Sequence, residues 1–197
     1  LPDRYESEGF DRESLAMPEN QVALILRVAA VNPRVAVVLA CGSVVDLRWA
    51  DAVSSILLMH LGGEAVGGAV ADLVAGKVNP SGKLAESWPL QLDDVPSHAY
   101  FPGYTRTVEY RESIFVGYRY YDTAQKSVRY PFGYGLSYTR FSYSNLQLST
   151  TELHADETVT ITLDVTNTGS VPGAEAVQLY VSHHSDVMFT PEQELKG

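Results

Sequence analysis

The sequence predicts an α/β domain, an open and mostly parallel sheet flanked by helices, followed by an incomplete antiparallel β-sandwich. Three observations support this fold class. Short apolar runs alternate with helix-length segments in the first half of the chain, a pattern typical of βαβ units. From residue 141 on, polar residues alternate with β-branched or aromatic residues at period two, which predicts sandwich strands at residues 141–148, 158–169 and 174–184. A segment rich in tyrosine and glycine separates the two parts.

The first helix and the first two strands are predicted as follows. A helix begins near Pro18 and ends before Asn32 and Pro33, because apolar residues recur at helical spacing between them and proline stops a helix. Residues 35–42 and 55–63 are short apolar runs that end in glycine. Such runs are expected of strands that are buried on both faces and paired in parallel.

The connections and two glycine-containing motifs come next. Residues 46–53 are long enough for a short helix, and residues 64–76 predict another that a terminal glycine closes. "GKVNPSGK" (76–83) resembles a phosphate-binding loop, but its glycine spacing is wrong and no Ser or Thr follows the lysine. "GGEAVGG" (62–68) lacks the dinucleotide-binding spacing, so its glycines are expected to allow tight packing of a helix on the sheet.

Three sections divide the chain. We predict an α/β domain at residues 1–99, a Tyr/Gly-rich wrapping segment at residues 100–140, and a truncated sandwich at residues 141–197. A complete sandwich takes about seven strands and about 100 residues, so the carboxyl end is expected to continue beyond this sequence. The amino end lacks both an initiator methionine and a signal peptide, so we expect it to lie within a longer chain.

Composition excludes several classes of partner. The net charge of −10 argues against nucleic acid and anionic membranes, which the average surface would repel. No apolar run reaches the about 20 residues that span a bilayer. Cys41 is the single cysteine, so no internal disulfide forms and the cellular compartment stays open. No metal spacing or cofactor fingerprint appears, so no cofactor is expected.

Four motifs together resemble family 3 of the glycoside hydrolases, the β-glucosidase type. They are "YESEGFDR", "GKVNPSGKLAESWP", "VEYRESIFVGYRYYD" and "YPFGYGLSYTRF", in the order in which those enzymes carry them. The resemblance implies an upstream (β/α)8 barrel, then the α/β sandwich domain that begins this sequence, then a fibronectin type III-like domain. It also implies a retaining hydrolase whose nucleophilic aspartate lies on the barrel, and a small glycoside or oligosaccharide as substrate.

The loop before the first helix carries the candidate site. From the residues alone, its acidic side chains are expected simply to solvate a surface loop. The resemblance changes that expectation for Glu8, which matches the acid/base position of the family's Glu-Gly-(Tyr/Phe)-Asp-Arg motif. Glu6 is the alternative, and Tyr5 is a candidate beside the aglycone. Asp11 and Arg12 are expected to be structural, fixing the loop against the first helix.

The neighbours of Glu8 suit this role. Gly9 allows a close turn of the backbone, and Phe10 offers an apolar surface that favours a protonated carboxyl group. His60 and Glu64 follow the second strand, where open sheets place ligands, but a packed histidine and a solvated glutamate are the expected readings. This sequence alone is expected not to turn over glycosides, because the nucleophile is elsewhere. A non-catalytic carbohydrate-binding or scaffolding module is the alternative hypothesis.

Overall fold

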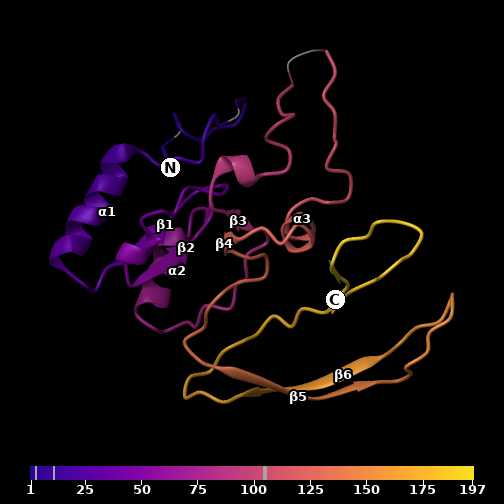
Figure 1. Cartoon of the computed structure of the whole chain (residues 1–197). Coiled ribbons are helices and arrows are strands. Elements are labelled where there is room, and N and C mark those ends of the chain that lie inside the picture. Colours follow the sequence, from indigo (N-terminus) through magenta and orange to yellow (C-terminus); the bar gives the residue numbers. More distant parts are fainter. Residues whose placement is uncertain (3, 11, 104–105) are drawn as a thin grey trace.

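The computed structural model describes residues 1–2, 4–10, 12–103 and 106–197 (Figure 1). A polar loop opens the chain and leads into helix α1 (Glu19–Val31). Pro18 lies immediately before the helix, and the helix ends at Asn32, as the sequence predicts. Proline suits this place because its fixed φ angle is compatible with helix entry and its missing N–H would have no partner there.

The predicted βαβ pattern forms a parallel pair of strands. Strands β1 (Ala36–Leu39) and β2 (Ser55–Leu58) are in register, with Val37 opposite Ile56. The connection contains only one short 3₁₀ helix, η1 (Ala50–Ala52). Parallel strands require a crossover, and the segment between these strands supplies it.

The core lies between this parallel pair, helix α1 and the segment that follows β1. Trp88 and Val45 are almost completely enclosed. Val22 and Ile25 pack against the core from α1. The remaining core residues are apolar and come mostly from one stretch of the chain: Met17, Leu39, Cys41, Val44, Leu47, Trp49 and Ala50.

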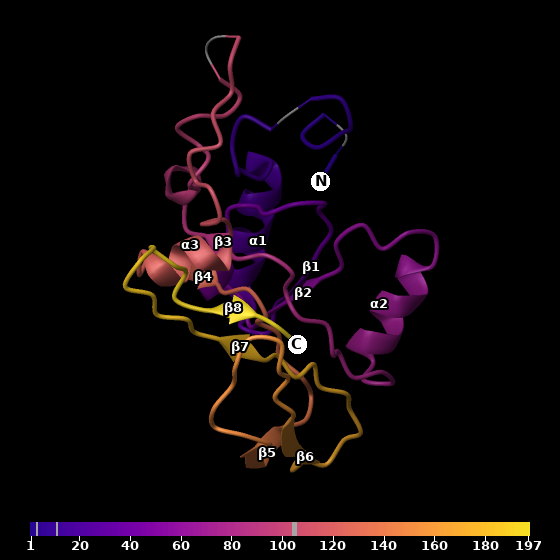
Figure 2. The same cartoon turned by 90° about the vertical axis from the view of Figure 1, so that its right-hand side faces the viewer.

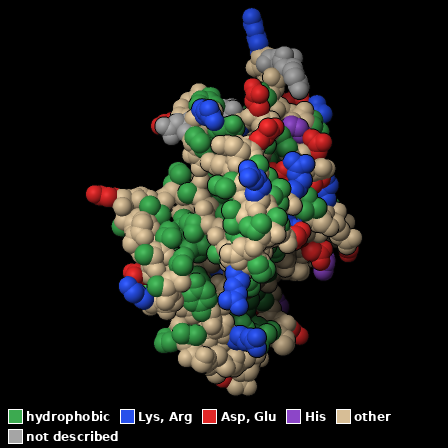
Figure 3. All heavy atoms as spheres, turned by 90° about the vertical axis from the view of Figure 1, so that its left-hand side faces the viewer, with side chains coloured by type: hydrophobic (Ala, Val, Ile, Leu, Met, Phe, Trp, Pro, Cys, Tyr) green, Lys and Arg blue, Asp and Glu red, His purple; other side chains and the backbone are tan. Residues whose placement is uncertain are grey.

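The prediction that β1 is buried on both faces is wrong for this chain. Leu39 is 4% exposed, but Val38, which points to the opposite face of the pleat, is 44% exposed. Helix α1 likewise buries only one face, and Val31 is 85% exposed. Figure 3, which shows the α1 side of the molecule, has hydrophobic side chains spread over this surface. The described segments cover only one face of the pair formed by β1 and β2.

Helix α2 (Val66–Val74) follows the second strand, and Gly76 closes it with a φ of +70°. The packing predicted for the "GGEAVGG" glycines holds only at Gly62, where an added Cβ would approach Val66 to 2.4 Å. Gly67 and Gly68 meet no atom within 4 Å. These two glycines therefore have no packing role among the described residues.

The part of the chain from residue 88 to residue 130 includes structure that the sequence did not predict. Strands β3 (Trp88–Pro89) and β4 (Val128–Tyr130) pair antiparallel, and the 3₁₀ helix η2 (Leu92–Asp94) and helix α3 (Tyr118–Thr123) lie between them. Several tyrosines pack against other aromatic rings. Tyr118 stacks on Phe132 at 4.8 Å and meets Tyr180 edge-on at 5.7 Å. These contacts join the segment to the last part of the chain.

The last part forms two antiparallel pairs. Strand β5 (Phe141–Leu148) matches the predicted strand and pairs with β6 (Ile161–Asn167) in a long ribbon (Figure 1). The period-two segment at residues 174–184 forms only β7 (Tyr180–Val181), which pairs with β8 (Glu194–Leu195). Alternation marks residues that can form a strand, but a strand needs a partner along its length.

The motif at residues 76–83 holds this last part against the α/β part. Asn79 donates to Pro172 O at 3.0 Å and accepts hydrogen bonds from Ser137 Oγ and Tyr138 N. Lys83 donates to Gly135 O at 2.8 Å. Its ammonium also lies 3.1 Å from a Glu175 carboxylate oxygen, and both side chains are about 15% exposed. Lys83 stands where a phosphate-binding loop would have its lysine, but in this structure it forms an ion pair with Glu175. We call these contacts the junction.

Candidate functional site

The polar loop at residues 1–18 is anchored on the segment that follows β1. The backbone nitrogen of Leu1 donates to Ala40 O at 2.6 Å, and the Asp46 amide donates to Leu15 O at 2.7 Å. Within the loop, the Tyr5 amide donates to Pro2 O at 2.8 Å and closes a turn. The described part of this loop is therefore tied to the carboxyl end of a parallel strand, where open sheets place ligands.

Glu6 is the main anchor of the loop. One carboxylate oxygen accepts a hydrogen bond from the Gly42 amide at 2.7 Å. The other accepts from the amide and the hydroxyl of Ser43, each at 3.2 Å. Gly42 fits closely, because a Cβ at this position would lie 3.4 Å from the Glu6 carboxylate. Glu6 is therefore an acceptor whose oxygens are already occupied.

The electrostatics of Glu6 favour the charged form. Partial burial opposes ionisation, but the hydrogen bonds from Gly42 and Ser43 and the nearby Arg12 outweigh it, so the pKa of Glu6 is lowered. A general acid must carry a proton when the substrate binds. A glutamate held ionised by three donors is poorly suited to that role.

Arg12 is structural, but its contacts differ from those predicted. Its guanidinium donates to Ser43 Oγ at 3.0 Å and to Val44 O at 2.8 Å, so it braces the loop against the segment after β1 instead of against α1. It also lies 3.8 Å from Glu6. Asp11, which was expected to share this role, lies outside the described residues.

Glu8 lies two residues beyond Glu6 and has a different environment. Its side chain is exposed, and no hydrogen bond or ion pair joins its carboxylate to any residue that the structure describes. Gly9 follows with a φ of +96°, a left-handed conformation that L side chains rarely adopt. Phe10 is 51% exposed. The anchored loop thus presents a free carboxyl group at its turn.

Tyr5 is half-buried at the base of this turn. The guanidinium of Arg4 lies over its ring, 5.1 Å from the ring centre. A cation on one face of the ring leaves the other face and the hydroxyl for further contacts. Its proposed place beside an aglycone remains a prediction.

Cys41 lies under the loop. Its side chain is 1% exposed, and its neighbours in the chain hold Leu1 and Glu6. Burial, together with the charge of Glu6, raises the pKa of the Cys41 thiol to about 11. Cys41 is therefore a packed, uncharged side chain with no role as a nucleophile.

Two titratable residues near the strand ends differ from the sequence-based expectation. The burial of His60 was predicted wrongly, and Glu86 was not identified. His60 was expected to be packed, but it is exposed, because β2 ends at Leu58 and a φ of +48° turns the chain away from the sheet. Glu86 was not singled out. Burial raises its pKa, although the charge of His60 opposes the shift. In the sequence, Glu86 is marked only by its position two residues before Trp88, a large apolar residue that the structure buries.

The part of the loop that the structure describes offers carboxyl groups but no cluster suited to a metal. Among the described residues, no group of three or more His, Cys, Asp or Glu side chains is arranged to hold an ion. Across the same residues, no helix is both long and apolar enough to cross a bilayer. The chemistry available at the loop is that of a carboxyl group.

A second projecting segment lies on the same side of the molecule. Residues 96–103 and 106–116, which we call the arm, extend from the α/β part beside the described residues of the loop at 1–18, and both project in the same direction in Figures 1 and 2. The arm is rich in exposed aromatic residues, with Tyr110 at 83% and Phe101 at 53%. The exposed Glu8 therefore shares its side of the fold with an aromatic surface.

Comparison with known proteins gives consistent results. The sequence profile of the glycosyl hydrolase family 3 C-terminal domain matches residues 1–138. The chain is 49% identical to the thermostable β-glucosidase B of Acetivibrio thermocellus and 48% identical to an exo-α-(1→6)-L-arabinopyranosidase of Bifidobacterium longum. Each match covers all of this chain and 26% of the relative, so the chain spans about a quarter of the length of these proteins.

Solved structures resemble the whole chain. A family 3 β-glucosidase from Bifidobacterium adolescentis superposes with a TM-score of 0.95 at 47% identity, over 100% of this chain and 29% of that one. A β-glucosidase from Kluyveromyces marxianus, solved in complex with glucose, gives a TM-score of 0.92 at 39% identity, over 100% of this chain and 23% of that one. The agreement extends over both the α/β part and the antiparallel strands.

Proposed function

This chain belongs to family 3 of the glycoside hydrolases, and we propose that it supplies the general acid/base, Glu8, of a retaining glycosidase that removes terminal β-linked sugars. The observation that carries the proposal is the contrast within one loop. Glu6 is held by three hydrogen bonds, whereas the side chain of Glu8 is exposed on the turn that these hydrogen bonds anchor. A proton-transferring group must be free to reach the substrate.

The proposed mechanism uses Glu8 twice. In the first step it donates a proton to the glycosidic oxygen while an aspartate of the barrel, elsewhere in the protein, attacks the anomeric carbon and forms a glycosyl ester. In the second step the Glu8 carboxylate takes a proton from water, whose oxygen displaces the aspartate. The proton balance then closes, because Glu8 is protonated again.

The two carboxyl groups of a retaining pair lie about 5–5.5 Å apart. This requirement explains why the loop would be anchored so firmly, since a displacement of about 1 Å costs about 10²-fold in rate. Glu6, Arg12 and Gly9 would act as positioning residues. The sugar itself is left open, because relatives named for two different sugars are 49% and 48% identical to this chain.

Glu8→Gln in the complete enzyme tests the proposal. The amide cannot donate a proton to a poor leaving group or deprotonate water, so alkyl glycosides should be hydrolysed about 10²–10⁴-fold more slowly. Aryl glycosides with a good leaving group need no protonation, so they should give a burst followed by slow turnover. Azide should speed the second step, because it needs no general base.

Glu6→Gln is the matched control. It should lower the rate by displacing the loop, but it should show neither the burst nor the rescue by azide. If Glu6→Gln gave both signatures and Glu8→Gln neither, the acid/base would be Glu6. If neither variant gave them, the loop would be a structural element without a catalytic group.

A further inference from the structure

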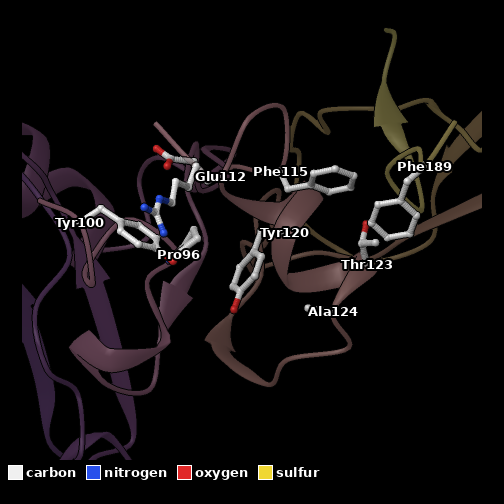
Figure 4. Close-up of a pocket in the computed structure, with 9 residues that line it drawn as sticks. Pro96, Tyr100, Glu112, Phe115, Tyr120, Thr123, Ala124 and Phe189 are labelled. Atoms are coloured by element: carbon white, nitrogen blue, oxygen red, sulfur yellow. The ribbon is translucent and has the colours of Figure 1, made fainter. Parts of the chain in front are cut away.

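A hollow of about 430 Å³ lies between the arm, helix α3 and the loop before β8 (Figure 4). Its size falls within the range of about 300–1,000 Å³ that is typical of small-molecule sites. Figure 4 shows Tyr100 and Pro96 on one side, Phe115 and Phe189 on the other, and Tyr120 between them. The other lining residues are Arg111, Glu112, Thr123 and Ala124.

The aromatic walls of this hollow are held by contacts among the lining residues themselves. Phe115 and Phe189 stack with their centroids 4.9 Å apart, which fixes the loop before β8 against the arm. Tyr100 is held by the Arg111 guanidinium, which lies 4.9 Å from its ring centre. Rings fixed in this way offer apolar edges to a ligand at little cost in conformational entropy.

Glu112 supplies an unsatisfied acceptor. Its Oε2 atom is buried and has no hydrogen-bond partner among the residues that the structure describes. A buried carboxylate oxygen without a donor is energetically unfavourable, so such an atom calls for an explanation. The nearest cation along the chain, Arg111, is already paired with Glu109. The Thr123 hydroxyl is also engaged, since it donates to Arg119 O and accepts from the Glu192 amide.

The charges on the walls disfavour an anionic ligand. Glu112 would repel an anion, and Arg111 is not free to bind one because its guanidinium is paired with Glu109. What fits is a neutral ring with hydroxyl donors for Glu112 and C–H faces for the aromatic walls. We propose that this hollow is a carbohydrate-binding pocket that holds a sugar unit, with the hydroxyls of the sugar donating to Glu112. Nothing in this argument depends on the role proposed for Glu8.

Hydrogen–deuterium exchange of the complete protein tests the pocket, with and without cellobiose supplied as its sulfur-linked analogue, which glycosidases do not consume. We expect cellobiose to slow exchange several-fold in residues 96–124 and 185–191. Glu8→Gln should leave that slowing unchanged, which separates this proposal from the proposed function. The absence of slowing in these segments at saturating cellobiose would overturn it.

Two substitutions at Glu112 identify the acceptor. Glu112→Gln keeps an acceptor oxygen and should retain the effect of cellobiose, whereas Glu112→Leu removes it and should weaken the apparent affinity about tenfold or more. Equal affinity in the two variants would overturn the proposal. Exchange without sugar shows whether each variant is folded.

Phe189→Ala keeps the proposal testable if Glu112→Leu fails to fold. Phe189 is 74% exposed, so its removal should not disturb the core. Because its ring forms one wall, the affinity for cellobiose should fall several-fold, and unchanged affinity would contradict the pocket. Glucuronate, an anionic sugar, serves as the probe of charge: it should bind more weakly than glucose, and stronger binding would also count against a site built around Glu112.

Discussion

The loop at residues 1–18 and the junction at residues 76–83 are both short, polar and rich in motif residues, but their polar groups are used differently. In the junction, Asn79 and Lys83 each contact one residue of the last part of the chain and also bind residues 135–138. In the loop, Glu6 is equally engaged, but Glu8 has no partner among the described residues. The difference shows how a structural use of a motif can be told from a functional one. A motif whose polar groups are all satisfied holds the fold together, and a free group on an anchored turn is available for chemistry.

Breaking the ion pair of the junction should have the largest effect on stability. Lys83→Met leaves Glu175 mostly buried without its partner, so the free energy of unfolding should fall by about 3 kcal/mol in chemical denaturation. Lys77→Met is the matched control, because its pair with Asp72 is exposed and should contribute less than about 0.5 kcal/mol. Similar losses in the two variants would mean that the junction does not couple the two parts.

Glu6→Gln should have the next largest effect, confined to the loop. The amide keeps one acceptor but places an NH₂ group near the donors of Ser43, which should loosen residues 1–18 by about 1.5–2 kcal/mol in local hydrogen exchange. Glu13→Gln, an exposed residue of the same loop, should change nothing. If the two variants behaved alike, Glu6 would not be the anchor.

Gly9→Ala should have a smaller effect. At a φ of +96° an alanine is strained, and the added Cβ meets no atom within 4 Å, so the cost is of the backbone alone, about 1 kcal/mol. Gly68→Ala in α2 is the opposite case, since it also meets no atom within 4 Å but lies in a helix. It should stabilise the protein by about 0.5–1 kcal/mol in thermal unfolding. Two changes of the same sign would contradict this assignment.

The smallest expected effect is a pH dependence that distinguishes the two regions. Because the pKa of Glu6 in the folded protein is lowered from 4.5, its contribution to stability is present above that value and is lost as the pH falls through the folded pKa. Loop exchange, corrected for the intrinsic rate, should therefore rise in acid and should lose this dependence in Glu6→Gln. A dependence that survives the substitution would assign the titration to another group.

The sequence predicted the elements whose limits depend on local chemistry. Helix α1 begins after Pro18 and ends at Asn32, and β5 spans the predicted period-two segment. It did not predict the short helix α3, whose six residues are held by packing of Tyr121 and its neighbours more than by helix propensity. Residues 174–179 were predicted as part of a strand. In the structure, Glu175 and Gln178 are bound by Lys83 and Gly133 of the α/β part instead.

The candidate site was predictable only in part, because some of its contacts join residues that are far apart in the sequence. The position of Glu8 follows from its motif, since Gly9 and Arg12 stand at fixed spacing from it. The contrast with Glu6 could not be foreseen, because the donors that hold Glu6 lie 36 and 37 positions away and meet it only after β1 forms. Glu112 was missed because an acidic residue in a tyrosine-rich segment gives no sign of burial.

The buried thiol beneath the loop gives this protein a built-in chemical reporter. Cys41 is the single cysteine of the chain, it is 1% exposed, and its raised pKa leaves almost no thiolate at neutral pH. A thiol-modifying reagent therefore has one target in this chain, and it can reach that target only when the packing around Cys41 opens. The rate of modification under excess reagent then measures how often the core beneath the loop that carries Glu8 opens. No label has to be introduced, because Cys41 is next to Gly42, whose amide donates to Glu6.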